Sequence, residues 1–247
     1  ENRVFYRGDN ISTGNFFRAP ANIFMEGEEI GLFYGFETDG IYQTEDDIAV
    51  AGAQPGDVRI IDQDGDGAIT EADRTIIGNP NPDFVYGGYI NMNYKRFSLS
   101  VQMNGVHGND IANGNLIQLG TADGRAVNIL SDAYTNAWRP EAQSNTQPRV
   151  GYLGESGSPA ITDRIIEDGS FLRINNITLG YDIPVENMKA LSSANIYLSG
   201  INLFTFTNYS GYNPEITNFL NNGNITGVDW NGFPNAQTIM LGLNVTF

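Results

Sequence analysis

The sequence predicts an all-β chain whose antiparallel strands belong to the wall of a large transmembrane β-barrel with long extracellular loops. Three observations lead to this fold class. The clearest strands alternate strictly between apolar and polar residues, their polar faces consist of Ser, Asn and Gln rather than Lys and Glu, and short connections alternate with long ones. Such a polar face is typical of a wall that lines water.

The first predicted element is a hairpin over residues 85–103. One face of both strands carries Tyr86, Ile90, Met92 and Tyr94, then Phe97, Leu99, Val101 and Met103. The other face carries Asn91, Asn93, Ser98, Ser100 and Gln102. Because two runs of period two are joined by the two residues Lys95 and Arg96, they predict a β-hairpin.

Four further strands are predicted, at residues 29–38, 170–182, 194–206 and 238–247. In the last of them, Ile239, Leu241, Leu243, Val245 and Phe247 alternate with small or polar residues. This pattern is typical of the closing strand of an outer-membrane barrel, although the terminal strand of a soluble β-sandwich has the same pattern.

Long loops are predicted over residues 39–82, 108–169 and 208–235, and short connections over 95–96 and 184–193. In outer-membrane barrels the short turns are periplasmic and the long loops extracellular. One helix is predicted inside the second long loop, over residues 125–138, because apolar residues recur there at helical spacing before Pro140.

Composition excludes several function classes. With 29 Asp and Glu against 13 Lys and Arg, the 247-residue chain has a formal charge of -16, which argues against a nucleic-acid partner. The absence of Cys and the single histidine, His107, remove thiol chemistry and multi-histidine metal sites.

Asp163, Glu167 and Asp168 fit a solvated loop edge better than a glycosidase pair. We therefore predict no catalytic residues and no enzyme activity.

The sharpest motif is an EF-hand-like loop at residues 62–73. Carboxylates at positions 1, 3 and 5 suit one hard cation, and Gly67 at position 6 permits the tight turn. Position 12 is Asp rather than the usual bidentate Glu, and the residues before the loop look extended. The sequence predicts a structural calcium site, with a metal-free Asp/Gly turn as the alternative. The predicted ligands are Asp62, Asp64, Asp66, Ala68, Thr70 and Asp73.

Aromatic residues in the long loops are candidates for ligand binding, because aromatic faces stack on sugars and grip peptides. An aromatic belt at the membrane interface explains them equally well. The candidates are Trp138, Tyr152, Tyr209, Tyr212 and Trp230.

Several ordered motifs resemble the C-terminal part of SusC/RagA-type TonB-dependent outer-membrane transporters. They include the aspartate loop followed by residues 73–82, the segment 31–41, the hairpin turn at 94–97, the segment 168–181 and residues 202–207. The similarity extends from about Gly27 to Phe247, nearly the whole chain.

The resemblance implies that residues 1–247 are a C-terminal segment of a 22-stranded barrel, without the plug and the N-terminal strands. It also implies the outer membrane of a Gram-negative bacterium, import of oligosaccharides or oligopeptides, energy from TonB, and a SusD-like surface lipoprotein as a lid. The expected partners are thus the rest of the barrel and the plug, that lipoprotein, TonB, a glycan or peptide ligand, and membrane lipid.

One alternative from another class stays open, a secreted calcium-stabilised β-sandwich that binds glycan without catalysis. The environment of the apolar strand faces separates the two hypotheses. A barrel exposes Leu241 and its neighbours to lipid, whereas a sandwich buries them against a second sheet.

Overall fold

In the computed structural model the chain divides into two compact units, and the described residues are 11–16, 19–120, 128–152, 161–188, 190–216 and 225–247. Unit 1 contains residues 1–81, 110–168 and 215–232, and unit 2 contains residues 82–109, 169–214 and 233–247. Unit 1 therefore gathers most of the three predicted long loops together with the N-terminal segment. Unit 2 contains most of the predicted long strands.

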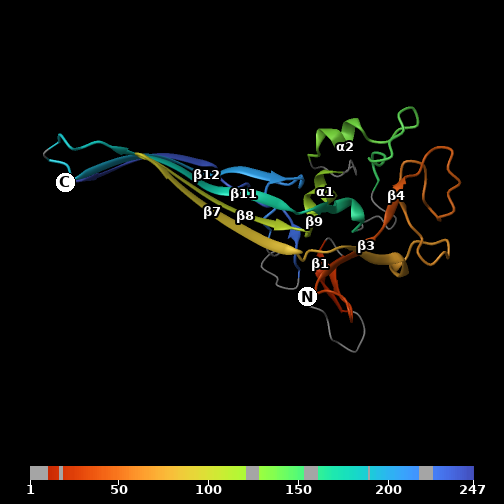
Figure 1. The fold of residues 1–247 in the computed structure, drawn as a ribbon. Coiled ribbons are helices and arrows are strands. Elements are labelled where there is room, and N and C mark those ends of the chain that lie inside the picture. The colour runs from red at the N-terminus through yellow and green to blue at the C-terminus, as the bar shows by residue number, and fades with distance from the viewer. Residues whose placement is uncertain (1–10, 17–18, 121–127, 153–160, 189, 217–224) are drawn as a thin grey trace. The chain divides into compact units, whose positions relative to one another are not determined.

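Unit 2 is a five-stranded antiparallel sheet in the order β14-β12-β11-β8-β7. Its long strands lie side by side in Figure 1. Their bounds are β7 Phe84–Tyr94, β8 Phe97–His107, β11 Phe171–Ile183, β12 Ser193–Thr207 and β14 Thr238–Thr246.

The predicted hairpin is confirmed, because β7 and β8 pair from Phe84↔His107 to Tyr94↔Phe97 without a shift in register. Lys95 adopts the left-handed conformation (φ 55°) that lets two residues close the turn. One irregularity interrupts β11, where a β-bulge lies between Ile174 and Asn176.

Unit 1 contains many short strands. One of them, Leu32–Phe36, confirms the strand predicted at residues 29–38, and the sequence pattern did not reveal the others. One sheet has the order β1-β2-β3-β6, formed by β1 Ile11–Phe16, β2 Ala19–Phe24, β3 Leu32–Phe36 and β6 Arg74–Gly78. A second sheet has the order β10-β9-β13, formed by β10 Ile166–Asp168, β9 Asp110–Asn113 and β13 Val228–Asp229. A two-stranded sheet pairs β4 Thr38–Ile41 with β5 Val58–Ile60.

The predicted helix over residues 125–138 is wrong in its extent. Leu130 is extended (φ −63°, ψ 142°), and the helix α2 covers Ser131–Thr135 alone, while residues 121–127 lie outside the described residues. A second helix that was not predicted, α1, covers Gly114–Leu119, and two 3-10 turns cover Glu71–Asp73 and Asp163–Ile165. No helix among the described residues is long and apolar enough to cross a membrane.

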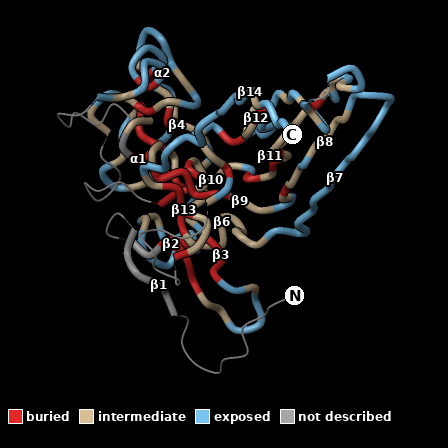
Figure 2. Tube along the Cα trace, turned by 90° about the vertical axis from the view of Figure 1, so that its left-hand side faces the viewer, coloured by how far each residue is buried: buried red, intermediate tan, exposed pale blue. Residues whose placement is uncertain are grey.

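The core of unit 1 joins segments that are far apart in sequence. Its buried residues are Ala21, Phe33, Ala112, Ile117, Ile161, Ile165, Ile225 and Val228. They come from the N-terminal segment, the second long loop and the third. Figure 2 shows buried stretches of the chain near β10 and β13. Burying the Phe, Ile and Val side chains of this core is worth about 1.5–3 kcal/mol each, which explains why these segments fold together rather than remain separate loops.

Candidate functional site

The sheet of unit 2 has one continuous apolar face. Three rows of side chains cross the five strands in register. They are Ile90–Val101–Ile177–Gly200–Ile239, Met92–Leu99–Leu179–Leu198–Leu241 and Tyr94–Phe97–Tyr181–Ile196–Leu243. Alternation in the paired segments that follow the bulge of β11 produces these rows, because a register shift of one residue would turn the face over.

Nothing in the described residues covers this apolar face. Leu241 is 72% exposed and Met92 59%, and Figure 2 shows β7 exposed along its length. A β-sandwich would pack a second sheet against these side chains and bury them. The observed exposure therefore contradicts the sandwich alternative, and it is the arrangement of a sheet whose apolar face meets lipid.

Aromatic side chains border the apolar face at both ends. Tyr94, Phe97 and Tyr181 form the row next to the short hairpin turn, and the rings of Phe97 and Tyr181 are 4.9 Å apart. At the other end lie Phe84, Tyr86, Phe204 and Phe206, all exposed by at least 40%.

The spacing of these aromatic ends fits a bilayer. The ten steps between the eleven residues from Phe84 to Tyr94 span about 34 Å at 3.4 Å per residue. With a strand tilt of about 40°, this becomes about 26 Å across the membrane, close to the apolar band of about 25 Å between the aromatic girdles of outer-membrane barrels.

The opposite face of the sheet is polar and almost uncharged. The Ser100 hydroxyl donates to the Tyr89 hydroxyl at 3.2 Å, and Thr178 Oγ1 lies 2.9 Å from Ser199 Oγ across the strands. The charged exceptions are Asp182, which accepts from Asn195, and Arg173, which is 3% exposed and bonded to Thr205 and Asn213. Hydroxyl and amide groups of this kind suit a water-filled lumen.

Close cross-strand contacts between an aromatic ring and a glycine are a feature that the sequence did not reveal. The ring of Tyr197 lies against Gly242 of the neighbouring strand, and the ring of Tyr86 lies against Gly105. Any side chain at either glycine would collide with the ring. The register of the strands, which places each glycine opposite a tyrosine, is the signal that could have found these pairs.

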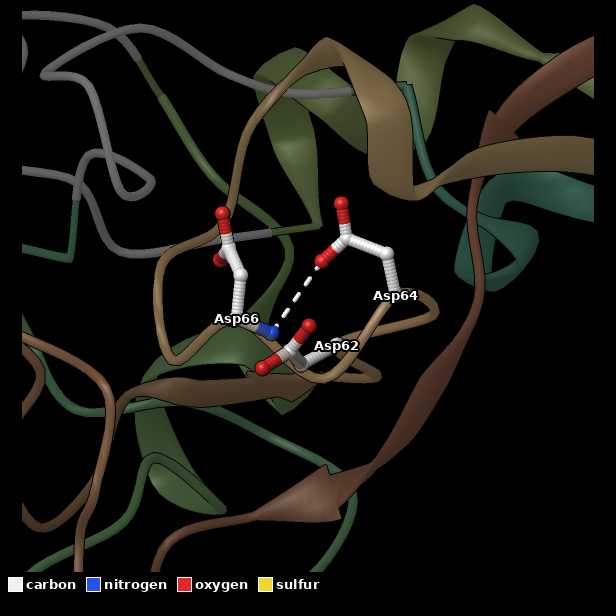
Figure 3. A group of neighbouring side chains, drawn as sticks. All are labelled: Asp62, Asp64 and Asp66. Atoms are coloured by element: carbon white, nitrogen blue, oxygen red, sulfur yellow. Dashed lines mark hydrogen bonds between the residues drawn. The ribbon is translucent and has the colours of Figure 1, made fainter.

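The second candidate site is the aspartate loop between β5 and β6 in unit 1. Asp62, Asp64 and Asp66 each offer a carboxylate oxygen within 4.8 Å of the others, and Figure 3 shows the three side chains grouped on the loop. The glycines Gly65 (φ 75°) and Gly67 (φ 83°) supply the left-handed turns that bend the chain around them.

Backbone amides already hold these carboxylates in place. The N–H groups of Gly65 and Gly67 donate to the two oxygens of Asp62 at 2.7 and 2.8 Å, and the N–H of Asp66 donates to Asp64 at 3.1 Å. Since an ionised carboxylate has about four lone-pair positions, each can still accept a cation. The Asp66 N–H lowers the pKa of Asp64, but desolvation and the charges of Asp66, Asp73 and Asp62 outweigh it and raise that pKa overall.

Asp73, the predicted ligand at position 12, does not join this group. Its side chain is buried, and its two oxygens accept the backbone N–H groups of Gln63 (2.8 Å) and Thr70 (2.6 Å). The bond from Thr70 is the first of several that lower the pKa of Asp73, against the opposing effect of burial. The side chain of Thr70 is also engaged, because it caps the 3-10 turn by accepting from Ala72.

An anchor residue that the sequence did not reveal follows the loop. Arg74 is nearly buried, donates to the carbonyl oxygen of Tyr34 at 2.6 Å and to Glu71 at 3.0 Å, and stacks over the Tyr34 ring at 4.9 Å. These bonds tie the end of the aspartate loop to β3. The end of the loop is thus anchored to the folded unit, while Asp64 and Asp66 stay exposed to solvent.

The predicted aromatic ligand-binding residues are dispersed over both units. Trp138 is 6% exposed, packs against Ile41 and Val58, and donates from Nε1 to Gln43 Oε1 at 3.0 Å. Tyr152 packs against the same cluster, Trp230 packs against the main core of unit 1, and Tyr209 is 5% exposed. Tyr212 is 77% exposed and is the most exposed of the five.

The carboxylates considered for catalysis have structural partners. Asp163 accepts from the backbone N–H and the hydroxyl of Thr38, and Glu167 accepts from Asn113. Asp168 lies opposite Asp110 in the β10–β9 pair. The predicted solvated loop edge is therefore wrong for Glu167 and Asp168, which lie in the paired strand β10, and Asp163 and Glu167 are only partly exposed.

Comparisons with known proteins agree with this geometry. The chain is 36% identical over 256 residues to TonB-dependent receptor P3 of Formosa agariphila, an alignment that covers 97% of this chain and 25% of the relative. It is 28% identical to TonB-dependent receptor SusC of Bacteroides thetaiotaomicron, over 97% of this chain and 21% of SusC. No family model matches.

A similar fold occurs in the solved structure of the RagAB peptide transporter. The TM-score is 0.76 at 21% identity, and the match covers all of this chain and 25% of that one. The chain therefore spans about a quarter of the length of the relatives that it matches.

Proposed function

The chain is a C-terminal segment of a SusC/RagA-type TonB-dependent outer-membrane transporter, and from this premise we propose that the protein to which it belongs imports a nutrient across the outer membrane of a Gram-negative bacterium. Unit 2 supplies part of the barrel wall and its closing strand. Unit 1 supplies extracellular loop structure. The single observation that supports this best is the apolar face of unit 2, which runs uncovered across five strands in register.

In this proposal the segment forms part of the barrel wall and part of the extracellular rim. The polar face lines the path of a hydrophilic solute, and the apolar face holds the barrel in lipid. Import would further need the remaining strands, a plug, TonB-coupled force and a SusD-like lipoprotein over the mouth. The substrate class is an oligosaccharide or an oligopeptide.

Isolation of the full-length protein from outer membranes in mild detergent, with peptide mapping of everything that co-purifies, tests this proposal. We expect a particle much heavier than the 27.0 kDa of this chain, containing upstream barrel and plug peptides and a surface lipoprotein. TonB-dependent uptake of labelled oligomers by cells should be lost when the gene is deleted. A monodisperse 27.0 kDa particle that is stable without detergent would overturn the proposal.

A structural calcium ion in the aspartate loop is a second, separate proposal. It is supported by the grouping of Asp62, Asp64 and Asp66, with the Ala68 carbonyl as a further oxygen ligand. Asp73 then acts by holding the loop backbone rather than as a ligand. No reaction step is assigned to the metal.

Calcium titration of the full-length protein, followed by calorimetry and by protection of the loop from protease, tests this site. Asp64→Ala should abolish the calcium response, whereas Asp132→Ala, which removes an exposed carboxylate elsewhere in unit 1, should leave it intact. An unchanged response in Asp64→Ala would remove the site.

A further inference from the structure

The charge of this chain is divided very unevenly between its two units. Of the 29 acidic and 13 basic residues, 26 acidic and nine basic ones belong to unit 1, which gives that unit a formal charge of -17. Unit 2 contains the other three acidic and four basic residues and is close to neutral. Almost all of the acidity of the chain thus lies in the unit assigned to the extracellular side.

Internal bonds occupy the basic side chains in the described part of unit 1. Five of the nine lie in the described part of the chain, and each has a partner within the unit. Arg59 pairs with Asp39 and Asp46, and Arg149 pairs with Asp57. Arg74 bonds to Glu71, while Arg139 and Arg164 donate to backbone carbonyl oxygens. These cations are therefore poorly placed to attract an anionic solute.

Exposed carboxylates dominate the surface of the same unit. Eight of them are exposed and form no ion pair among the described residues. They are Glu26, Glu28, Glu45, Asp47, Asp64, Asp66, Asp132 and Glu141. They are spread over all of unit 1 that precedes residue 150, so the negative potential belongs to the unit as a whole and not to one cluster.

The polar face of unit 2 does not counterbalance this potential. Its side chains are mainly Asn, Ser, Gln and Thr, and its arginine, Arg173, is buried and bonded to Thr205 and Asn213. A cationic solute therefore meets an attractive field at unit 1 and an uncharged wall at unit 2, whereas an anionic solute is repelled by unit 1.

From this division of charge we propose that unit 1 steers cationic oligomers to the transporter, and that the preferred substrates are basic oligopeptides rather than neutral or acidic ones. The inference rests on the proposed import function. It concerns the summed field of the unit and assigns no single carboxylate as a binding site. Electrostatic steering raises association rates by about 10- to 1000-fold and is screened by salt, with a Debye length of about 10 Å at 0.1 M.

Association kinetics of the full-length transporter complex with three labelled oligopeptides of equal length, rich in Lys, Gln or Glu, test the proposal. In about 20 mM salt we expect the Lys peptide to associate at least about tenfold faster than the Glu peptide, with the Gln peptide between them. In about 500 mM salt the three rates should converge, because the Debye length falls below about 5 Å. Equal rates at low salt would overturn the proposal.

Variants separate the field of unit 1 from other causes. In one variant Glu28→Gln, Asp47→Asn, Asp132→Asn and Glu141→Gln remove four exposed charges outside the aspartate loop. In its matched control Glu28→Asp, Asp47→Glu, Asp132→Glu and Glu141→Asp conserve them. The ratio of the Lys to the Glu association rate should fall several-fold in the first variant and stay unchanged in the control. An unchanged ratio in the neutralised variant contradicts steering by unit 1.

Two further arms identify the source of the effect. An oligomer of glucosamine carries ammonium groups without a peptide backbone. If this oligomer associates faster than the neutral peptide while the Lys peptide does not, the assignment to peptides is overturned. Energised uptake of the neutral peptide distinguishes the two proposals. If cells import it without any preference for charge, steering fails and the importer stands, whereas import of no oligomer of any charge defeats the proposed function itself.

Discussion

The two units of this chain use apolar side chains in opposite ways. In unit 1 Phe33 is fully buried among residues from three distant segments, as in any water-soluble domain. In unit 2 Leu241 is 72% exposed on a sheet that has a regular apolar face and no described layer over it. Charge follows the same division, since unit 1 carries almost all of the acidic residues. The difference teaches that one chain can bury some of its apolar side chains in a core of its own and leave others to contact surrounding lipid.

The largest expected effect is in the core of unit 1. Phe33→Ala should destabilise unit 1 by about 3–5 kcal/mol, because it opens a cavity in a packed core. Hydrogen exchange measured on the full-length protein should show faster exchange in β3 and β6 but not in β11 and β12. Phe233→Ala, which truncates a side chain that is 89% exposed, is the control and should change little. Equal exchange in both variants would mean that unit 1 lacks a core of its own.

A charge on the apolar face of unit 2 should have the next largest effect. Leu241→Arg places a guanidinium in the middle of the lipid-facing band and should cost about 2–4 kcal/mol. Met240→Arg, one residue away on the polar face, should cost much less. The amount of full-length protein assembled in outer membranes and its unfolding midpoint in detergent measure both. If the two variants behave alike, the assignment of the two faces is wrong.

Within unit 1, the buried carboxylate of Asp73 should matter for stability and for its pH dependence. Asp73→Asn weakens two charge-assisted hydrogen bonds and should cost about 1–3 kcal/mol at pH 7. Because folding lowers the pKa of Asp73, its stabilisation is complete above the ordinary value of 3.8 and is lost as the pH falls through the lowered value. Protease resistance of residues 62–74 between pH 7 and pH 2 should therefore decline less steeply in Asp73→Asn than in the wild type.

The smallest expected effect has the opposite sign. Burial raises the pKa of Asp110, the N–H of Asn79 lowers it, and the charge of Asp168 directly opposite raises it further. The ionised group thus destabilises the fold above this raised pKa, and the penalty disappears as the pH falls through it. Asp110→Asn keeps an oxygen for the Asn79 N–H and should stabilise unit 1 by about 0.2–1 kcal/mol at pH 7.

Thermal unfolding of the full-length protein at pH 7 and at pH 4 checks the Asp110 prediction. The gap between Asp110→Asn and the wild type should be larger at pH 7 than at pH 4. Asp132→Asn, at an exposed position on α2, is the matched control. A variant that is less stable than the wild type at pH 7 would show that the carboxylate is needed for its bond to Asn79.

Much of unit 2 could be predicted from the sequence, because its strands are long and each residue faces either lipid or water. A period of two over Phe97 to Met103, or over Ile239 to Phe247, identifies both the strand and its apolar face. The bulge between Ile174 and Asn176 interrupts this period in β11, and no turn-forming residue in the sequence predicts it.

The candidate sites were predictable only in part. The spacing of Asp62, Asp64 and Asp66 places their carboxylates together, since a tight Gly-containing turn forces that grouping. It did not show that Asp73 is buried with both oxygens occupied by backbone amides. Likewise the aromatic character of Trp138 was visible, whereas its burial against Ile41 and Val58 depends on residues about 80 to 100 positions away.

By itself, the sequence determined the strands of the sheet, their apolar and polar faces, the aspartate loop and the total charge, because each depends on residues close together in the chain. Only the tertiary structure decided that the predicted long loops form a unit with its own core, that α2 begins at Ser131, and that the acidic residues gather in that unit. A strand of two residues, such as β13 at Val228–Asp229, carries too short a pattern to be read locally. It exists because pairing with the distant strand β9 satisfies its backbone groups and buries its side chains.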